Sequence, residues 1–401
     1  MKKTGKTPLS KACYLVAILV PAWASAENND PLRLGAGVSW MSDSNLFRAD
    51  SSTPDAVRSD RATSAFALLS AETTLSRQRL YADLNVGSVK FSKSSYLDYD
   101  TQDLSAGWSG EFPLRLRSGI DWKRSQTLAS FADLGTPRRN LVRRDSLNGN
   151  FDLPFAGDWH LIAAGGGSQS RNSNAIDAVS DVDANSFEAG FRYATSYGNQ
   201  FDVVLHSAHT RYPERSLNAL FDTQYREQLA DFRVQWAASG ASRLVGHAGY
   251  LRRRNQNLDY RNFSGASFRL VHIWQASGSL GLNTTIYRDM GAAGDNEFDA
   301  VVSKGLRFEP GWELSSKTRL GAALEWAQRD YLGNVQEILF GAGAAGEARR
   351  DQTRSARLFV SYAPSRWASL SASWCGAKRE SNRALRNYLD HSGTVNVQLL
   401  F

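Results

Sequence analysis

Long apolar stretches and cysteines are scarce in this sequence, and both shortages restrict what the chain can be. Beyond residue 26, charged residues or glycines interrupt every hydrophobic run within a few positions. No stretch approaches the roughly 20 apolar residues that a transmembrane helix needs, so membrane-spanning helices are excluded. The 401 residues include only two cysteines, Cys13 and Cys375, which excludes a disulfide-rich secreted domain.

Motifs for catalysis and metal binding are also missing. The six histidines are scattered, with no His-Glu-x-x-His pattern and no Gly-x-Ser-x-Gly elbow nearby. His206 and His209 lie three residues apart, and in a strand this spacing points them to opposite faces rather than toward one metal ion. We therefore expect no enzymatic activity, no metal site and no cofactor.

The N-terminus has the composition of an export signal. Four lysines precede an apolar core from residue 14 to 23, and Ala24-Ser25-Ala26 forms a small-residue cleavage site. This core of about ten residues is too short to span a bilayer. We predict that residues 1–26 are a cleaved signal peptide and that 27–401 form one domain. Because the four lysines leave with the signal, the net charge falls from +7 to +3, and nucleic acid is not an expected partner.

Apolar and polar side chains alternate with a period of two along the whole mature chain. Leu32, Leu34, Ala36, Val38 and Trp40 alternate with polar residues and glycines, and helical spacing does not explain this pattern. A transmembrane β-strand of about ten residues alternates lipid-facing apolar with lumen-facing polar side chains, and its ends carry aromatic residues. The same alternation returns in segments 80–86, 104–108, 116–122, 147–153, 187–193, 232–236, 280–286, 298–302, 320–326, 358–362 and 370–374. A soluble β-sandwich with an aromatic core is the alternative.

The connections alternate in length, as a barrel with short turns at one end and long loops at the other requires. Eight tight turns are predicted at 76–78, 112–113, 154–158, 196–199, 238–242, 275–279, 309–311 and 364–366. Nine polar loops are predicted near 43–60, 92–98, 126–141, 171–182, 212–222, 255–259, 290–296, 332–350 and 379–387. The sequence therefore predicts an all-β fold, a single large antiparallel transmembrane β-barrel of about 18 strands, with 16 as the alternative.

The last segment, from Tyr388 to Phe401, alternates up to a terminal phenylalanine. It resembles the final strand of outer-membrane proteins generally, where this strand is the signal for insertion by the barrel-assembly machinery. The resemblance implies that Phe401 has this role and that the chain lies in the outer membrane of a Gram-negative bacterium. We expect both termini in the periplasm, with outer-membrane lipid and lipopolysaccharide as partners.

The side chains of opposite parity should line the lumen. Barrels of 16 to 18 strands leave an aqueous channel, so we expect transport. The residues expected inside are Arg115, Arg117, Lys123, Arg144, Arg192, Arg233, Lys317, Arg319, Arg357 and Tyr81. Acids share this face at Asp83, Asp121, Asp152, Glu188, Asp231 and Glu325. The lining is therefore either a cationic surface that attracts anions or a set of internal salt bridges that hold the wall together.

The opening strand and the segment Ser42-Asp43-Ser44-Asn45-Leu46-Phe47-Arg48 resemble the start of the EpsL-like family of β-barrel porins linked to exopolysaccharide export. This resemblance implies that a polysaccharide leaves the cell through the barrel with the help of a periplasmic export partner. An acidic polysaccharide would suit the cationic groups expected in the lumen. The alternative is a general or solute-specific porin that takes in small molecules. An outer-membrane enzyme is a third, less favoured class.

Overall fold

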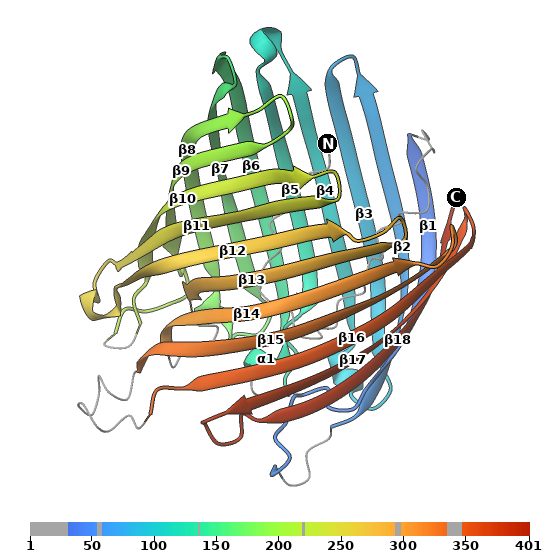
Figure 1. Cartoon of the computed structure of the whole chain (residues 1–401). Coiled ribbons are helices and arrows are strands. Elements are labelled where there is room, and N and C mark those ends of the chain that lie inside the picture. Colours follow the sequence, from blue (N-terminus) through green and yellow to red (C-terminus); the bar gives the residue numbers. More distant parts are fainter. Residues whose placement is uncertain (1–30, 54–57, 135–136, 219–220, 293–297, 335–346) are drawn as a thin grey trace.

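The computed structural model describes residues 31–53, 58–134, 137–218, 221–292, 298–334 and 347–401 (Figure 1), so the predicted signal, residues 1–26, lies outside the described residues. The strands are β1 (Leu32–Asp43), β2 (Asp60–Leu75), β3 (Gln78–Phe91), β4 (Tyr99–Glu111), β5 (Arg117–Leu128), β6 (Leu141–Ala156), β7 (Trp159–Asn172), β8 (Val182–Ala194), β9 (Gln200–Arg211), β10 (Gln224–Ser239), β11 (Ser242–Asn255), β12 (Phe263–Gln275), β13 (Leu280–Ala292), β14 (Phe298–Glu313), β15 (Thr318–Asn334), β16 (Arg350–Ser365), β17 (Ala368–Ser381) and β18 (Tyr388–Leu400). The helices are short: α1 (Phe131–Leu134), η1 (Ser95–Leu97), η2 (Pro113–Arg115), η3 (Ala178–Ser180) and η4 (Asp259–Arg261). Among these residues no helix is long and apolar enough to cross a membrane.

The strands form one closed ring. Each strand pairs antiparallel with the next in sequence, and β18 pairs with β1 to complete the barrel. At this seam Leu34 and Phe401 exchange backbone hydrogen bonds of 3.0 and 2.7 Å. Figure 1 shows the strands wrapping obliquely around a common axis. Closure leaves no open sheet edge, which a bilayer could not satisfy. The predicted all-β barrel of 18 antiparallel strands is confirmed.

The two faces of each strand differ as the alternation predicts. Large apolar side chains of one parity are exposed on the outside of the ring, such as Leu34 (50%), Phe187 (60%) and Leu205 (69%). Residues that pair directly across neighbouring strands share a face. The opposite parity, which carries most of the charged groups of the central strands, therefore faces the lumen. This division places the predicted lipid-facing residues outside.

Short turns lie at one end of the barrel and long loops at the other, which we call the turn end and the loop end. Seven of the eight predicted turns coincide with gaps between strands, but the turn predicted at Glu309-Pro310-Gly311 is wrong. Strand β14 continues through Pro310, which pairs with Leu282 of β13, and the pairing with β15 is interrupted beside it. Proline has no N–H to donate to the ladder, and Pro310 lies where the ladder has a gap, so the strand can continue through it. The turn begins five residues later and covers residues 314–317.

At the loop end, an apolar cluster fills part of the interior. Leu46 (2% exposed) from the loop after β1 and Phe131 of α1 pack on lumen-facing side chains of β2, β3 and β4. The rings of Phe47 and Phe131 meet edge to face, with centroids 4.9 Å apart. The lumen-facing members of the cluster are Ala62, Val89, Phe91 and Tyr99. Two loops, one after β1 and one after β5, therefore fold inward instead of extending from the rim.

Candidate functional site in the barrel lumen

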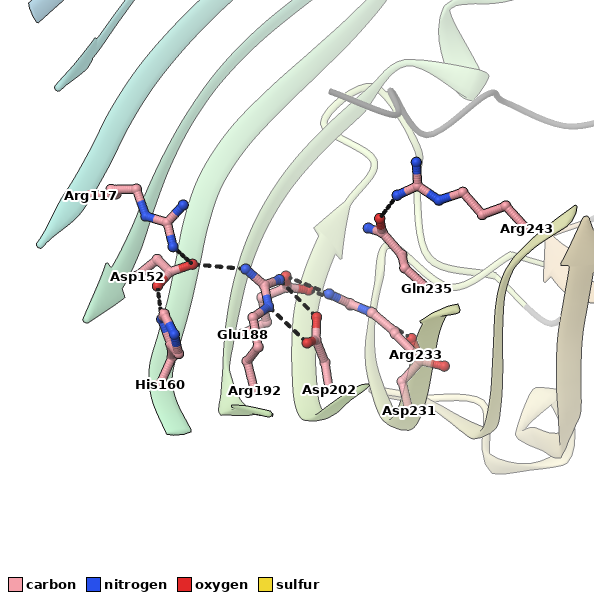
Figure 2. A network of polar contacts seen from close by, with 10 residues as sticks. All are labelled: Arg117, Asp152, His160, Glu188, Arg192, Asp202, Asp231, Arg233, Gln235 and Arg243. Atoms are coloured by element: carbon pink, nitrogen blue, oxygen red, sulfur yellow. Dashed lines mark hydrogen bonds and ion pairs between the residues drawn. The ribbon is translucent and has the colours of Figure 1, made fainter. Parts of the chain in front are cut away.

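One wall of the lumen carries a row of charged side chains on strands β5 to β9. The carboxylate of Asp152 accepts a hydrogen bond from Arg192 at 2.8 Å, lies 2.6 Å from His160 Nδ1 and lies 3.7 Å from an Arg117 nitrogen. Arg192 also donates two hydrogen bonds of 2.8 Å to Asp202. Figure 2 shows Arg192 between the two carboxylates. The guanidinium of Arg192, on β8, therefore neutralises carboxylates on two other strands, β6 and β9.

The row continues onto β10 and β11. Arg233 donates to both carboxylate oxygens of Glu188, at 3.0 and 2.8 Å, and to Asp231 at 2.9 Å (Figure 2). His206 lies 3.4 Å from Glu188, and His247 lies 3.0 Å from Asp231. Bidentate contacts of this kind fix a guanidinium in one orientation. Farther along, Arg243 donates to Gln235 at 2.6 Å.

Strand register brings these groups together. Arg192 stands directly opposite Asp202 on β9 and opposite His160 on β7, while Arg117 stands opposite Asp152. Opposite charges on directly paired residues are the favourable arrangement in an antiparallel sheet. Of the two interpretations open from the sequence, internal salt bridges therefore describe Arg117, Arg192 and Arg233.

Strands β12 to β15, which follow β11 around the ring, carry a smaller set of the same kind. Arg269 of β12 is ion-paired with Asp289 of β13. Arg307 of β14 donates to Glu309 at 2.6 Å and lies 3.9 Å from Glu325, which accepts a hydrogen bond of 2.9 Å from the Tyr287 hydroxyl. Sequence reasoning did not single out Arg269 or Arg307. Their lumen-facing parity, opposite to that of exposed Phe268 and Leu306, would have identified them.

Four of the predicted lining residues have no carboxylate within ion-pair distance in the described part of the chain: Lys123, Arg144, Arg319 and Arg357. Lys123 of β5 stands opposite Ser146 of β6, and Arg144 of β6 stands opposite Ser125 of β5. The two cations are therefore diagonal neighbours on one face. Arg319 of β15 stands opposite Ser361 of β16 and, on its other side, opposite Glu313 of β14, with which it forms no ion pair; Arg357 of β16 stands opposite Ala323. The lumen therefore holds one pair of neighbouring cations, Lys123 and Arg144, and two further cations, Arg319 and Arg357, that lie four register positions apart.

The other predicted lining residues have different positions. Arg115 lies in the turn after β4 with a left-handed backbone (φ 58°), and Lys317 lies in the turn before β15, where its Nζ donates to the Pro364 carbonyl at 2.9 Å. Neither belongs to a strand wall. Tyr81 is on the lumen face of β3, and its ring covers Gly107, where an added Cβ would lie 2.5 Å from the ring.

Inside the loop end, a second charged group holds the loop that follows β1. Arg48, which also has a left-handed backbone (φ 56°), donates to both oxygens of Asp43 at 3.0 and 3.1 Å and lies 3.1 Å from Asp390 of β18. Asp43 is 3% exposed and Asp390 is fully buried. Asn45 donates to the Leu389 carbonyl at 3.0 Å, which ties the same loop to β18. Segment 43–48 is thus a structural clamp at the mouth.

At the same end of the barrel, Arg379 of β17 holds the loop that contains α1. Arg379 donates to the carbonyl of Ala132 in α1 at 3.1 Å and to the carbonyl of Arg386 at 2.7 Å. At the rim, Ser52 and Asn387 hydrogen-bond to Asp50 and hold the pKa of that carboxyl below its ordinary value. Loops from distant parts of the chain are therefore joined at the loop end.

The histidines do not form a catalytic group in the described residues. Ser242 Oγ lies 2.8 Å from His272 Nε2 on the outer face, but no carboxylate contact to His272 accompanies this pair. His391 stacks on Trp374 with centroids 5.8 Å apart. His206 and His209 face inward and outward, respectively, as their spacing predicts. No group of three His, Cys, Asp or Glu side chains suited to a metal ion occurs in the described part.

Comparison with known proteins connects this architecture to outer-membrane channels. No family model matches the sequence, and no curated protein matches it. Similar solved structures include three from Pseudomonas aeruginosa: OccK9, OccK2 in complex with glucuronate, and OpdK with vanillate. Their TM-scores are all 0.51, with 14%, 11% and 10% sequence identity, over 92% of this chain and 98%, 98% and 99% of theirs. The shared feature is the fold, an outer-membrane porin barrel, and this fold fits a location in the outer membrane.

These comparisons correct two expectations. Membership of the EpsL-like family is wrong, because the structures that share this fold are substrate-specific small-molecule porins. Export of exopolysaccharide is wrong for the same reason, and the alternative, a porin for small solutes, agrees better with these structures. Physically, the residues of segment 43–48 hold an inward-folded loop: Arg48 donates to Asp43, and Asn45 donates to the Leu389 carbonyl. This structural role does not specify the solute.

Proposed function

We propose that this chain is an outer-membrane channel through which small water-soluble solutes diffuse into the periplasm, with a preference for anions and with both termini on the periplasmic side. The closed ring of 18 strands supports a passage, because barrels of this size are too wide to be filled by side chains alone. The inward loops at the loop end support a narrow passage rather than a wide pore. Porins, and not enzymes, share the fold.

The observation that carries the anion preference is the set of lumen-facing cations without carboxylate partners, Lys123, Arg144, Arg319 and Arg357. Arg117, Arg192 and Arg233 of the central wall are neutralised by Asp152, Glu188, Asp202 and Asp231, so they contribute little net field, whereas Arg243 donates to the uncharged Gln235. Charges that face a confined aqueous space bias which ions enter, because the low-dielectric wall focuses their field. Two of the similar proteins hold carboxylates, glucuronate and vanillate, which agrees with an anionic solute.

The test is reversal-potential measurement on the purified barrel in planar lipid bilayers under a KCl gradient. The wild-type channel should favour chloride over potassium. The variant K123Q/R144Q/R319Q/R357Q removes the four free cations without leaving a buried acid unpaired, so the preference should be lost or reversed. Permeation of glucuronate relative to an uncharged sugar of equal size should fall about fivefold to tenfold, as expected for loss of a few kT of attraction.

The matched control is R143Q. Arg143 precedes Arg144 in the sequence but has the opposite parity and lies 3.4 Å from Asp145 on the outer face. It should leave selectivity unchanged. If the four-residue variant keeps the wild-type reversal potential, these cations do not select the solute. If the wild-type barrel shows no conductance at all, the channel function itself is rejected.

A further inference from the structure

The outer face of the barrel carries an arginine cluster that the lumen function does not use. It consists of Arg211 at the end of β9, Arg226 on β10, and Arg252 and Arg254 on β11. All four side chains are exposed and have the parity of the lipid-facing residues Leu205, Phe232 and Tyr250. They therefore point away from the lumen, on the loop-end half of the outer surface.

Register places these guanidinium groups close together. Arg226 stands directly opposite Arg254 on the neighbouring strand. On its other side, Arg211 stands opposite Gln224, two residues along, so it is a diagonal neighbour of Arg226. Arg252 follows on the same face of β11, opposite Gln228. Like charges directly opposite each other destabilise an antiparallel sheet, so this arrangement costs free energy unless something neutralises it.

No carboxylate in the described residues does so. The acid that stands opposite Arg211 is Asp183, and it is ion-paired with Arg171 at 2.5 Å. Glu227 and Asp231 of β10 have the lumen parity and pair with Arg253 and Arg233. By contrast, several other outward-facing cations have carboxylate partners: Arg124 and Arg143 with Asp145, Lys304 and Arg350 with Asp330, and Lys378 with Glu380.

The position of the cluster indicates what would neutralise it. Tyr250 (57% exposed) and Phe232 (46%) belong to the apolar outer surface of the same two strands. Arg252 follows Tyr250 after two residues, or roughly 7 Å along the strand. The cluster therefore begins where the apolar surface ends, at the depth of lipid headgroups. Arginine binds phosphate oxygens through two parallel N–H donors.

We propose that Arg211, Arg226, Arg252 and Arg254 bind the phosphorylated headgroup of an outer-leaflet glycolipid, whose acyl chains lie along Tyr250, Phe232 and their apolar neighbours. A headgroup with two phosphates supplies enough negative charge to bridge the directly opposed Arg226 and Arg254. The site rests on the outer-membrane location and is independent of which solute the lumen passes.

Binding is tested with the purified full-length barrel in a zwitterionic detergent. The probes are lipid A with two phosphates, the same lipid after enzymatic removal of both phosphates, and inorganic pyrophosphate. Native mass spectrometry counts bound lipid, and titration gives the Kd. Bisphosphorylated lipid A should bind, and R211Q/R226Q/R252Q/R254Q should raise its Kd at least about tenfold, because several charge-assisted hydrogen bonds are lost. The dephosphorylated lipid should bind the wild type as weakly as the variant.

The control variant is R143Q/K378Q, which removes two outward-facing cations that have acidic partners; its Kd should stay within about twofold. A second readout separates binding from folding. Without lipid, R226Q should resist thermal unfolding slightly better than the wild type, since it removes the opposed charges, whereas bound lipid A should reverse that order.

Three outcomes would overturn the proposal. Equal affinity of the quadruple variant and the wild type for lipid A would show that the cluster is not the site. Equal affinity of the wild type for intact and dephosphorylated lipid would show that phosphate is not recognised. Competition by pyrophosphate at the same concentration as lipid A would show that the site takes a free anion and not a membrane lipid.

Discussion

Replacing Arg48 by glutamine should release the loop that follows β1 from the mouth of the barrel. Arg48 lies between two carboxylates, Asp43 and Asp390, of which the first is 3% exposed and the second is fully buried. Removing one partner of a buried ion pair typically costs 3–5 kcal/mol, because the remaining charge stays desolvated. Protonation of one carboxyl group relieves part of this cost, so we expect about 3 kcal/mol near neutral pH.

A loss of this size changes the ratio of released to docked loop by about two orders of magnitude. Single-channel recording should show a higher conductance with frequent transitions, and protease added from the loop side should cleave between β1 and β2 faster than in the wild type. Lowering the pH should restore docking in R48Q, because protonated carboxyl groups no longer repel each other. R48K, which keeps the positive charge, should lie between the two. Unchanged conductance and proteolysis in R48Q would refute the role of this ion pair.

Three further predictions concern other parts of the barrel. F131A removes the ring that packs on Phe47, so it should destabilise the docked position of α1 by roughly 3 kcal/mol and raise conductance, which F187A on the lipid face should not do. Burial raises the pKa of Asp222 in the loop before β10, but hydrogen bonds from Asn257 and its neighbours lower it below the ordinary 3.8. Because the pKa of Asp222 is lower in the folded state, its contribution to stability is present above pH 3.8 and is lost as the pH falls through the lowered pKa. The Leu258 N–H donates to this carboxylate, so hydrogen exchange at Leu258 should rise over that pH range in the wild type. In D222N the exchange at Leu258 should be high at every pH. G107V should expel the Tyr81 ring, since an added Cβ would lie 2.5 Å from it, and the loss should appear as a lower unfolding temperature that Y81A partly restores.

The sequence predicts the barrel well because its main signal is local. Alternation with a period of two follows from strand geometry alone, and the lengths of the connections set the strand number. The turn at 309–311 was wrong because Pro-Gly usually ends a strand, whereas here Pro310 lies beside a gap in the β14–β15 ladder. The exact boundaries between turns and strands could not be predicted either, so Arg115 and Lys317, which lie in turns, were wrongly placed on the lumen wall.

The charged pairs of the lumen could not be predicted residue by residue. Parity places Arg192 and Asp202 on the same face, but only the register between β8 and β9 makes them direct partners. A shift of that pairing by two residues would keep both side chains inside and separate them. Because the register could not be predicted, the sequence also did not distinguish ion-paired arginines, such as Arg233, from cations without an ion-paired carboxylate, such as Arg357. The inward loops depend on contacts between residues that are more than 200 positions apart, as between Arg379 and Ala132.

The seam between Leu34 and Phe401 has a consequence for biosynthesis. The first and last strands pair with each other, so a chain with seventeen of its eighteen strands translated still has two open sheet edges. Lipid cannot satisfy the unpaired N–H and C=O groups of these edges. Completion is an all-or-nothing event that waits for the final residues. Joining the two ends with a short linker and opening a long loop instead would move that last step elsewhere on the circumference without altering the finished ring.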